Sequence, residues 1–390
     1  MRLLENIKKG WFLFFFFLGT CYALYGSLFD QDVPELSGVV EERETVACTL
    51  ETILDGSYQS YIDNLWNEIF PGRDRLMRLR NQILYTVCSE SPNSNVVIGR
   101  EKYLFTPTYI GYETQILSPA SEEYFQQLGE KLEKLGEMLE ANGKEMYIFI
   151  TPSKAHFCYD KIPMLYKMVE KLEGRVESNY DKLVWELNKR DLHYFDAISY
   201  IENNNEKYDA PVFYKSGIHW SHVWGESAAA ELIRYMDQVG KYDLSQFCVT
   251  EKLTNECIWP NSDLHDSLNL SVPSVEEWYS TEITVMKEGG DKPSVFLRGG
   301  SFMGQSLNML INNYAFSEDV HFENSYYFTN VYSDHKDITN FRAYDEMNLN
   351  ELVGQSDILI LEVNNAAISD MSWGFIDYLL EHTEYLDDVY

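Results

Sequence analysis

Basic residues are scarce in this sequence. Its 390 residues include 31 lysines and arginines against 62 aspartates and glutamates, which gives a formal net charge of −31. Nucleic acids and anionic lipid surfaces repel such a chain, and no basic stripe compensates for the charge. We therefore expect no nucleic-acid partner, and we expect the acidic surface to serve mainly solubility.

Metal-binding patterns are also missing. The sequence has no H-E-x-x-H motif and no His/Cys cluster at the spacing of metal ligands, and only His219 and His222 lie three residues apart. We therefore expect no metal and no cofactor.

Cysteines are few and form no C-x-x-C pair. In an oxidising compartment Cys248 could pair with Cys257, and Cys48 with Cys88. The alternative, that several of them are buried thiols, stays open.

The sequence contains one long uncharged run, at residues 11–29. It follows Arg2, Lys8 and Lys9, and acidic residues come directly after it. Its length just spans a bilayer, and the positive charge holds the N-terminal side in the cytoplasm. This pattern predicts a cytoplasmic tail at residues 1–10, a transmembrane anchor at 11–29 and an extracytoplasmic remainder. A cleaved signal peptide is the alternative, but the run is long for one and no A-x-A site follows.

Beyond the anchor, the composition is that of a folded protein, with 45% hydrophobic residues. Residues 30–50 are acidic without periodicity, which predicts a tether, and residues 51–94 have helical spacing, which predicts a helical lead-in. The main domain is expected over residues 95–390. There, helices predicted at 121–142, 175–189, 221–239 and 302–311 alternate with strands at 146–150, 193–196, 294–297, 325–328 and 357–363. This alternation predicts an α/β fold, a mainly parallel sheet with helices on both faces.

A candidate nucleophile stands where one of these strands ends. The predicted strand at 294–297 leads into Arg298, Gly299, Gly300 and Ser301, and a helical pattern follows at once. Glycines permit a tight turn, and a serine there lies at the carboxyl edge of the sheet, where α/β ligand sites form. Free N–H groups at the helix start, with Ser301 and Gly300 as candidates, could stabilise an oxyanion. The alternative is that Ser301 only caps the helix.

A candidate base lies before the helix predicted at 221–239. His219 is followed by Trp220 and preceded, two residues earlier, by Gly217, a setting typical of an exposed histidine. If His219 meets Ser301, it can take the hydroxyl proton and activate the serine.

These segments resemble a known family in their order and spacing. The matching motifs extend over roughly residues 60–370 and are Phe70-Pro71-Gly72-Arg73-Asp74, Val97-Ile98-Gly99 leading to Tyr103-Leu104-Phe105, Ile150-Thr151-Pro152-Ser153-Lys154, His219-Trp220, Gly299-Gly300-Ser301-Phe302 and the strand from Asp357 to Glu362. Together they resemble SGNH-hydrolase-like O-acetyltransferases of the DHHW and alginate O-acetyltransferase J/X (AlgX/AlgJ-like) group.

The resemblance implies an enzyme that transfers acetyl groups onto hydroxyls of an extracytoplasmic polysaccharide through an acetyl-serine intermediate. It assigns the nucleophile to Ser301 and the base to His219. It also implies a membrane-bound O-acyltransferase partner that supplies the acetyl group, and the predicted anchor fits a protein tethered at the bacterial surface or in the periplasm.

The sequence departs from the family pattern near the histidine. The family often has Asp two residues before it, where this chain has Gly217, and Asp or Thr before the serine, where it has Gly300. We expect the orienting acid elsewhere, with Asp196, Asp209 and Glu362 as candidates.

Three further residues are candidates for substrate binding. Trp220 adjoins the base, Lys154 follows a family motif, and Arg298 precedes the turn. Two other functions stay open, a carbohydrate acetyl esterase and an inactive anchored subunit that binds glycan or serves as a scaffold.

Overall fold

The computed structural model describes residues 45–69, 73–312, 315–317, 320–324, 330–333, 336–339 and 350–386, and a few isolated residues between 10 and 37. Most of the predicted tail, anchor and tether falls outside these residues, and all three stay predictions. So does the strand expected at 325–328. Among the described residues, no helix combines the length and apolar composition needed to cross a membrane. They include all six cysteines, and no disulfide forms among these.

The chain folds into two compact units. The smaller consists of residues 1–94 with 265–274, and the larger of residues 95–264 with 275–390. The smaller unit contains α2 (Leu50–Leu54), α3 (Ser57–Ile69) and α4 (Arg73–Ile83), followed by a π-helical turn at Leu84–Cys88. Asn81 of α4 is buried, and its side chain donates to the Leu268 carbonyl at 2.9 Å, which joins the two segments of this unit.

The larger unit is built on a five-stranded sheet in the order β4-β3-β11-β7-β8. Every neighbouring pair is parallel. The strands are β3 (Glu145–Thr151), β4 (Tyr194–Asp196), β7 (Val295–Gly299), β8 (Val320–Asn324) and β11 (Ile358–Asn364). The central strand β11 is buried throughout, and its first four residues, Ile358–Leu361, form the continuous apolar run that is typical of a strand covered on both faces.

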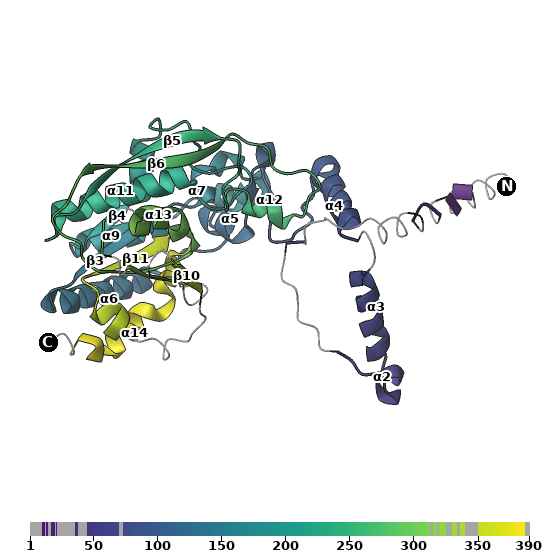
Figure 1. The fold of residues 1–390 in the computed structure, drawn as a ribbon, viewed down its shortest axis with the longest axis horizontal. Helices are drawn as coiled ribbons and strands as arrows, with labels where there is room; N and C mark the ends of the chain where they lie inside the picture. The colour runs from purple at the N-terminus through teal and green to yellow at the C-terminus, as the bar shows by residue number, and fades with distance from the viewer. Residues whose placement is uncertain are drawn as a thin grey trace. The chain divides into compact units, whose positions relative to one another are not determined.

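Helices cover both faces of this sheet (Figure 1). Along β3, Ile148 and Ile150 face a core formed with α6 (Glu122–Ala141), α9 (Asn179–Lys189) and α14 (Phe375–Glu381). The alternate residue Tyr147 faces α11 (His222–Val239), since its ring contacts that of Tyr235 at 6.3 Å. This period of two is the pleat of a strand. The predicted fold class, a parallel sheet between two helical layers, is confirmed.

Helix boundaries follow the capping residues. The helix predicted at 175–189 begins only at Asn179, because Ser178 and Asp181 form a capping box there. The helix predicted at 302–311 begins as a 3₁₀ turn at Ser301–Met303 and continues as α13 (Gly304–Asn312). The motif around Gly99 forms a short antiparallel pair of strands, β1 (Val97–Ile98) and β2 (Leu104–Phe105). Strands β5 (Gln246–Thr254) and β6 (Trp278–Lys287) form an antiparallel ribbon that was not predicted. This ribbon lies over α11 (Figure 1).

Candidate active site

Ser301 stands at the carboxyl edge of the sheet, where β7 gives way to the 3₁₀ turn and then to α13. The turn passes very close to β11. A Cβ on Gly299 would lie 2.7 Å from Glu362 Cβ, so only glycine fits there. The turn leaves Ser301 exposed to solvent, whereas its neighbour Phe302 is buried.

His219 meets Ser301 across the edge of the sheet. Its Nε2 lies 2.9 Å from Ser301 Oγ, which is hydrogen-bond distance. The Phe302 ring lies 4.9 Å from the imidazole, centroid to centroid, and supports it from one side. The structure therefore brings together the two residues that the sequence selected as nucleophile and base.

The third member of the group is Asp263, at the start of α12 (Asp263–Ser267). Its Oδ2 lies 2.7 Å from His219 Nδ1, and its Oδ1 accepts hydrogen bonds from the amides of Ile218 and Leu264. An acceptor at Nδ1 fixes the proton on that nitrogen and leaves Nε2 to accept the serine proton. Ser301, His219 and Asp263 thus have the arrangement of a catalytic triad.

The predicted orienting acids need correction, because none of the three contacts Nδ1 of His219. Asp196 caps α10 (Ala197–Asn203) and accepts the Tyr180 hydroxyl. Asp209 is exposed, and its backbone N–H donates to Glu251. Glu362 is buried beneath the serine turn, where it accepts from Thr151 and from the amide of Gly300. Burial raises the pKa of Glu362 to about 7, and these two hydrogen bonds offset part of that shift.

Gly217 shows why the acid comes from another segment. A Cβ on Gly217 would lie 2.5 Å from the carbonyl oxygen of Asn261, so no side chain fits at this position. The segment that fills the space leads directly to Asp263. Sequence reasoning missed this residue because 44 positions separate it from His219 and no local motif marks it.

Lys154 was expected to contact substrate, and the structure contradicts this. Its side chain is fully buried, and its ammonium donates to the carbonyls of Tyr214, Lys215 and Gly217 at 2.6–2.8 Å. Burial lowers the pKa of Lys154 to about 8, although nearby acidic groups oppose the shift. Lys154 therefore holds the loop that carries His219, and all three of its donors are used.

The other two substrate-binding predictions are also corrected. Trp220 is fully buried, and its indole donates to the Phe302 carbonyl at 2.9 Å, which ties the histidine loop to the serine turn. Arg298 is fully buried too, with its guanidinium 4.9 Å from the Phe375 ring centroid. Neither side chain is exposed to a ligand.

The two amides that the sequence offers as oxyanion donors differ in whether they already have a partner. The Gly300 amide donates to Glu362 at 2.7 Å, so it is already occupied. The Ser301 amide, at the start of the 3₁₀ turn, is the remaining candidate from the sequence.

Comparison with known proteins adds a family match and several similar structures. Residues 96–271 match the family model described as "ALGX: SGNH hydrolase-like domain, acetyltransferase AlgX". The matched segment contains His219 and Asp263 and ends before Ser301. A comparison with curated proteins finds no match.

Three of the similar solved structures are of bacterial proteins. The O-acetyltransferase domain of Pseudomonas putida AlgJ is 14% identical, with 75% of this chain and 99% of that chain covered and a TM-score of 0.44. Pseudomonas aeruginosa AlgX is 14% identical, with 72% and 67% covered and a TM-score of 0.42. Bacillus cereus PatB1 with a sulfonyl adduct is 11% identical, with 72% and 99% covered and a TM-score of 0.45.

The resemblance seen in the sequence is therefore confirmed by an independent match. Over residues 96–271 the chain is similar to the SGNH hydrolase-like domain of the AlgX acetyltransferase family.

Proposed function

We propose that this protein is a serine O-acetyltransferase that moves acetyl groups onto hydroxyls of an extracytoplasmic polysaccharide through acetyl-Ser301. The observation that carries the proposal is the hydrogen-bonded series from Ser301 Oγ through His219 to Asp263. The family match at residues 96–271 supports acetyl transfer as the chemistry.

In the first half-reaction, Ser301 Oγ attacks the carbonyl carbon of the donor's acetyl group. His219 Nε2 accepts the hydroxyl proton, and Asp263 stabilises the imidazolium that forms. The tetrahedral intermediate places its negative oxygen at the Ser301 amide. When this intermediate collapses, the bond to the donor oxygen breaks, that oxygen takes the proton from His219, and Ser301 is left acetylated.

In the second half-reaction, a sugar hydroxyl takes the place of the donor. It gives its proton to His219 Nε2 while its oxygen attacks the acetyl carbon, and Ser301 leaves with the proton. Charge and protons balance, and no cofactor takes part. If water attacks instead, the same residues give an acetyl esterase, which is the second candidate.

The inactive-scaffold alternative loses its main support in this structure. Its support was Gly217, which stands where the family often has the orienting aspartate. Because Asp263 supplies the carboxylate from another segment, Gly217 does not leave His219 without an acid.

Attachment to the membrane and the source of acetyl groups extend this proposal. The uncharged run at residues 11–29, with positive charge before it, supports a single-pass anchor that leaves the main domain outside the cytoplasm. We propose that a membrane-bound O-acyltransferase delivers the acetyl group to this domain.

The test uses the full-length protein with p-nitrophenyl acetate, in the presence and absence of a soluble oligosaccharide. We expect release of nitrophenolate, and a loss of at least about 10⁴-fold in Ser301→Ala and His219→Ala. Ser271→Ala, at an exposed serine of the smaller unit, is the matched control. Acetyl groups on the oligosaccharide indicate a transferase, and free acetate alone indicates an esterase. Wild-type protein no faster than Ser301→Ala would refute both.

A further inference from the structure

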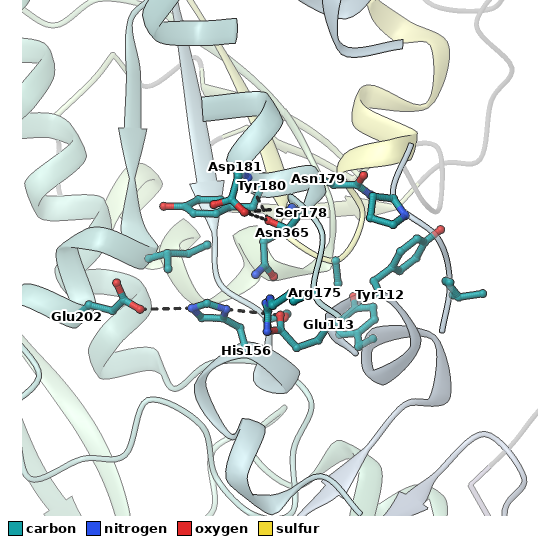
Figure 2. Close-up of a pocket in the computed structure, with 16 residues that line it drawn as sticks. Tyr112, Glu113, His156, Arg175, Ser178, Asn179, Tyr180, Asp181, Glu202 and Asn365 are labelled. Carbon is teal, nitrogen blue, oxygen red and sulfur yellow. Dashed lines mark hydrogen bonds and ion pairs between the residues drawn. The ribbon is translucent and has the colours of Figure 1, made fainter. Parts of the chain in front are cut away.

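A second feature of the sheet edge is a cavity of about 270 Å³ that the triad does not use. Ser153, just after β3, and Asn365, just after β11, line its floor, and α5 (Pro107–Glu113) contributes Tyr109 and Tyr112 to its wall. Figure 2 shows the labelled residues around it. The cavity therefore lies at the same carboxyl edge as Ser301.

The cavity is close enough to Ser301 for one chain-like ligand to occupy both places with neighbouring residues of its chain. Neighbouring strands lie about 4.8 Å apart, so the ends of β11 and β3 are about 5 and 10 Å from the end of β7. A direct contact also links the two places, because the Tyr109 ring lies 5.9 Å from that of Phe302, the residue after Ser301. A chain-like ligand bound in the cavity would pass beside the triad.

The lining of the cavity holds three carboxylates, Glu113, Asp181 and Glu202, and two basic side chains, Arg175 and His156. Glu113 pairs with Arg175 at 2.9 Å and with His156 at 3.5 Å, and His156 also pairs with Glu202 at 3.3 Å (Figure 2). Arg175 has a second partner in Glu170 at 3.5 Å.

The pKa shifts of His156 and Glu113 both favour the charged form, which strengthens these ion pairs. Burial lowers the pKa of His156, but Glu113 and Glu202 more than offset this, so the net shift is upward. Burial raises the pKa of Glu113, and His156 with Arg175 reverses the shift.

The remaining acid, Asp181, is occupied by the helix cap. It accepts the N–H and the hydroxyl of Ser178 at 3.0 and 2.6 Å. Among the described lining residues, each basic side chain is thus paired with two carboxylates. A uronic acid would need a spare cation, and this lining has more carboxylates than basic side chains, so the cavity suits an uncharged sugar rather than a uronate.

Asn365 supplies a polar group for such a ligand. Its amide N–H donates to the Thr151 carbonyl at 2.9 Å, which fixes the backbone. Its side-chain Oδ1 is buried and has no hydrogen-bond partner within the described part of the chain. A buried acceptor without a donor is costly, and a ligand hydroxyl would satisfy it.

The shape and lining of the cavity suit a sugar ring. Tyr109, Tyr112 and Tyr180 contribute flat aromatic surfaces with polar ends. The volume is just below the usual range of small-molecule pockets, about 300–1,000 Å³, so it has room for one ring. We propose that this cavity is an acceptor subsite that binds one uncharged hexose residue of the polysaccharide, next to the residue acetylated at Ser301. This rests on the proposed function and narrows its substrate to a neutral rather than a uronic-acid glycan.

The first test compares ligands on the full-length wild-type protein and needs no substitution. Binding of neutral hexamers, one of glucose and one of mannose, is measured by calorimetry beside a hexamer of uronic acids. We expect a neutral hexamer to bind at least about tenfold more tightly than the uronate, because the latter would bury an unpaired charge. The proposal is overturned if neither neutral hexamer binds or if the uronate binds as tightly.

The second test places the bound sugar in this cavity. Asn365→Ala removes the buried acceptor, and we expect its Kd for the neutral hexamer to rise about tenfold. Asn203→Ala, at an exposed asparagine at the end of α10, is the matched control and should leave the Kd unchanged. Equal Kd values for Asn365→Ala and wild type would overturn the proposal. Failure of the proposed function is visible separately, as a wild-type protein that binds the hexamer but never releases nitrophenolate from p-nitrophenyl acetate.

Discussion

Asp263 reaches His219 from a segment 44 residues away in sequence, and its two oxygens have separate tasks. Oδ2 contacts the imidazole, while Oδ1 accepts the Ile218 and Leu264 amides. The amide of Ile218 belongs to the residue just before His219, so the same carboxylate positions the ring and the backbone that carries it.

Replacing this acid tests its role. Asp263→Asn keeps the size of the side chain but can hold the wrong tautomer of His219, which costs about 10⁴-fold in turnover in a serine protease. We expect a loss of that order in the hydrolysis of p-nitrophenyl acetate, with a normal melting temperature. Asp209→Asn is the matched control, since this predicted acid is exposed and lies away from His219. Similar rates for Asp263→Asn and wild type would rule out a triad.

The sequence identified Ser301 and His219 because local signals mark both. Ser301 lies at a strand–glycine–helix junction, and His219 lies just before the cap of a helix. Asp263, Lys154 and Trp220 act through contacts between segments distant in sequence, and such contacts leave no periodic or capping signal. Lys154 in particular looks like a surface lysine until its three carbonyl partners are seen.

At the scale of elements, two loops determine the site, and they interlock. The loop at 214–217 is held from below by Lys154, and the segment at 260–263 passes directly against Gly217. The same close approach that excludes a side chain from position 217 brings Asp263 within reach of His219. Asp263, brought close by this backbone contact, therefore takes the place of the aspartate that the family often has at position 217.

A methyl group added at Gly217 tests whether the close contact between the two loops is needed for activity and stability. Gly217→Ala would place a Cβ 2.5 Å from the Asn261 carbonyl oxygen, and overpacking of this kind costs about 1–3 kcal/mol. We expect a lower melting temperature and a reduced kcat, because the segment that moves carries Asp263. Gly304→Ala is the control beside Ser301, since nothing lies within 4 Å of its Cβ position. If Gly217→Ala retains full activity and stability, the two loops are not interlocked.

The elements themselves were predicted to different extents. β11 was identified because its stretch Ile358–Leu361 is continuously apolar, as is typical of a buried strand. The ribbon of β5 and β6 was missed because half of the residues of β6 are exposed and the rest follow no regular order, so no alternation marks the strand. Starts of helices were shifted by a few residues wherever a capping residue decided the boundary, as at Ser178.

At the scale of the whole molecule, the ionisation of Glu362, which lies beneath the serine turn, makes the stability of the fold depend on pH. Its pKa is about 7 in the folded chain against 4.5 when unperturbed, mainly because it is buried. Between these values the folded state binds more protons than the unfolded state, so the free energy of unfolding falls as pH rises through this window. The contribution is fully present below about pH 4.5 and is lost above about pH 7.

Glu362→Gln removes this titration and keeps an oxygen that can accept from the Gly300 amide. We expect the free energy of unfolding to fall between pH 5 and pH 8 by about 2–3 kcal/mol less in Glu362→Gln than in wild type. Urea denaturation at both pH values measures it. Glu206→Gln, at an exposed position, controls for the loss of one charge from a chain of net charge −31. The same fall in both variants would show that Glu362 does not titrate in this range.

The most direct measurement is the site of covalent acetylation. Full-length wild type, Ser301→Ala and His219→Ala are mixed with p-nitrophenyl acetate, quenched in acid and mapped by peptide mass spectrometry. We expect an acetyl group on Ser301 of the wild type, none at position 301 in Ser301→Ala, and much slower acetylation of Ser301 in His219→Ala. A wild-type protein that turns over the ester without ever carrying acetyl on Ser301, or a His219→Ala variant acetylated there at the wild-type rate, would contradict this expectation.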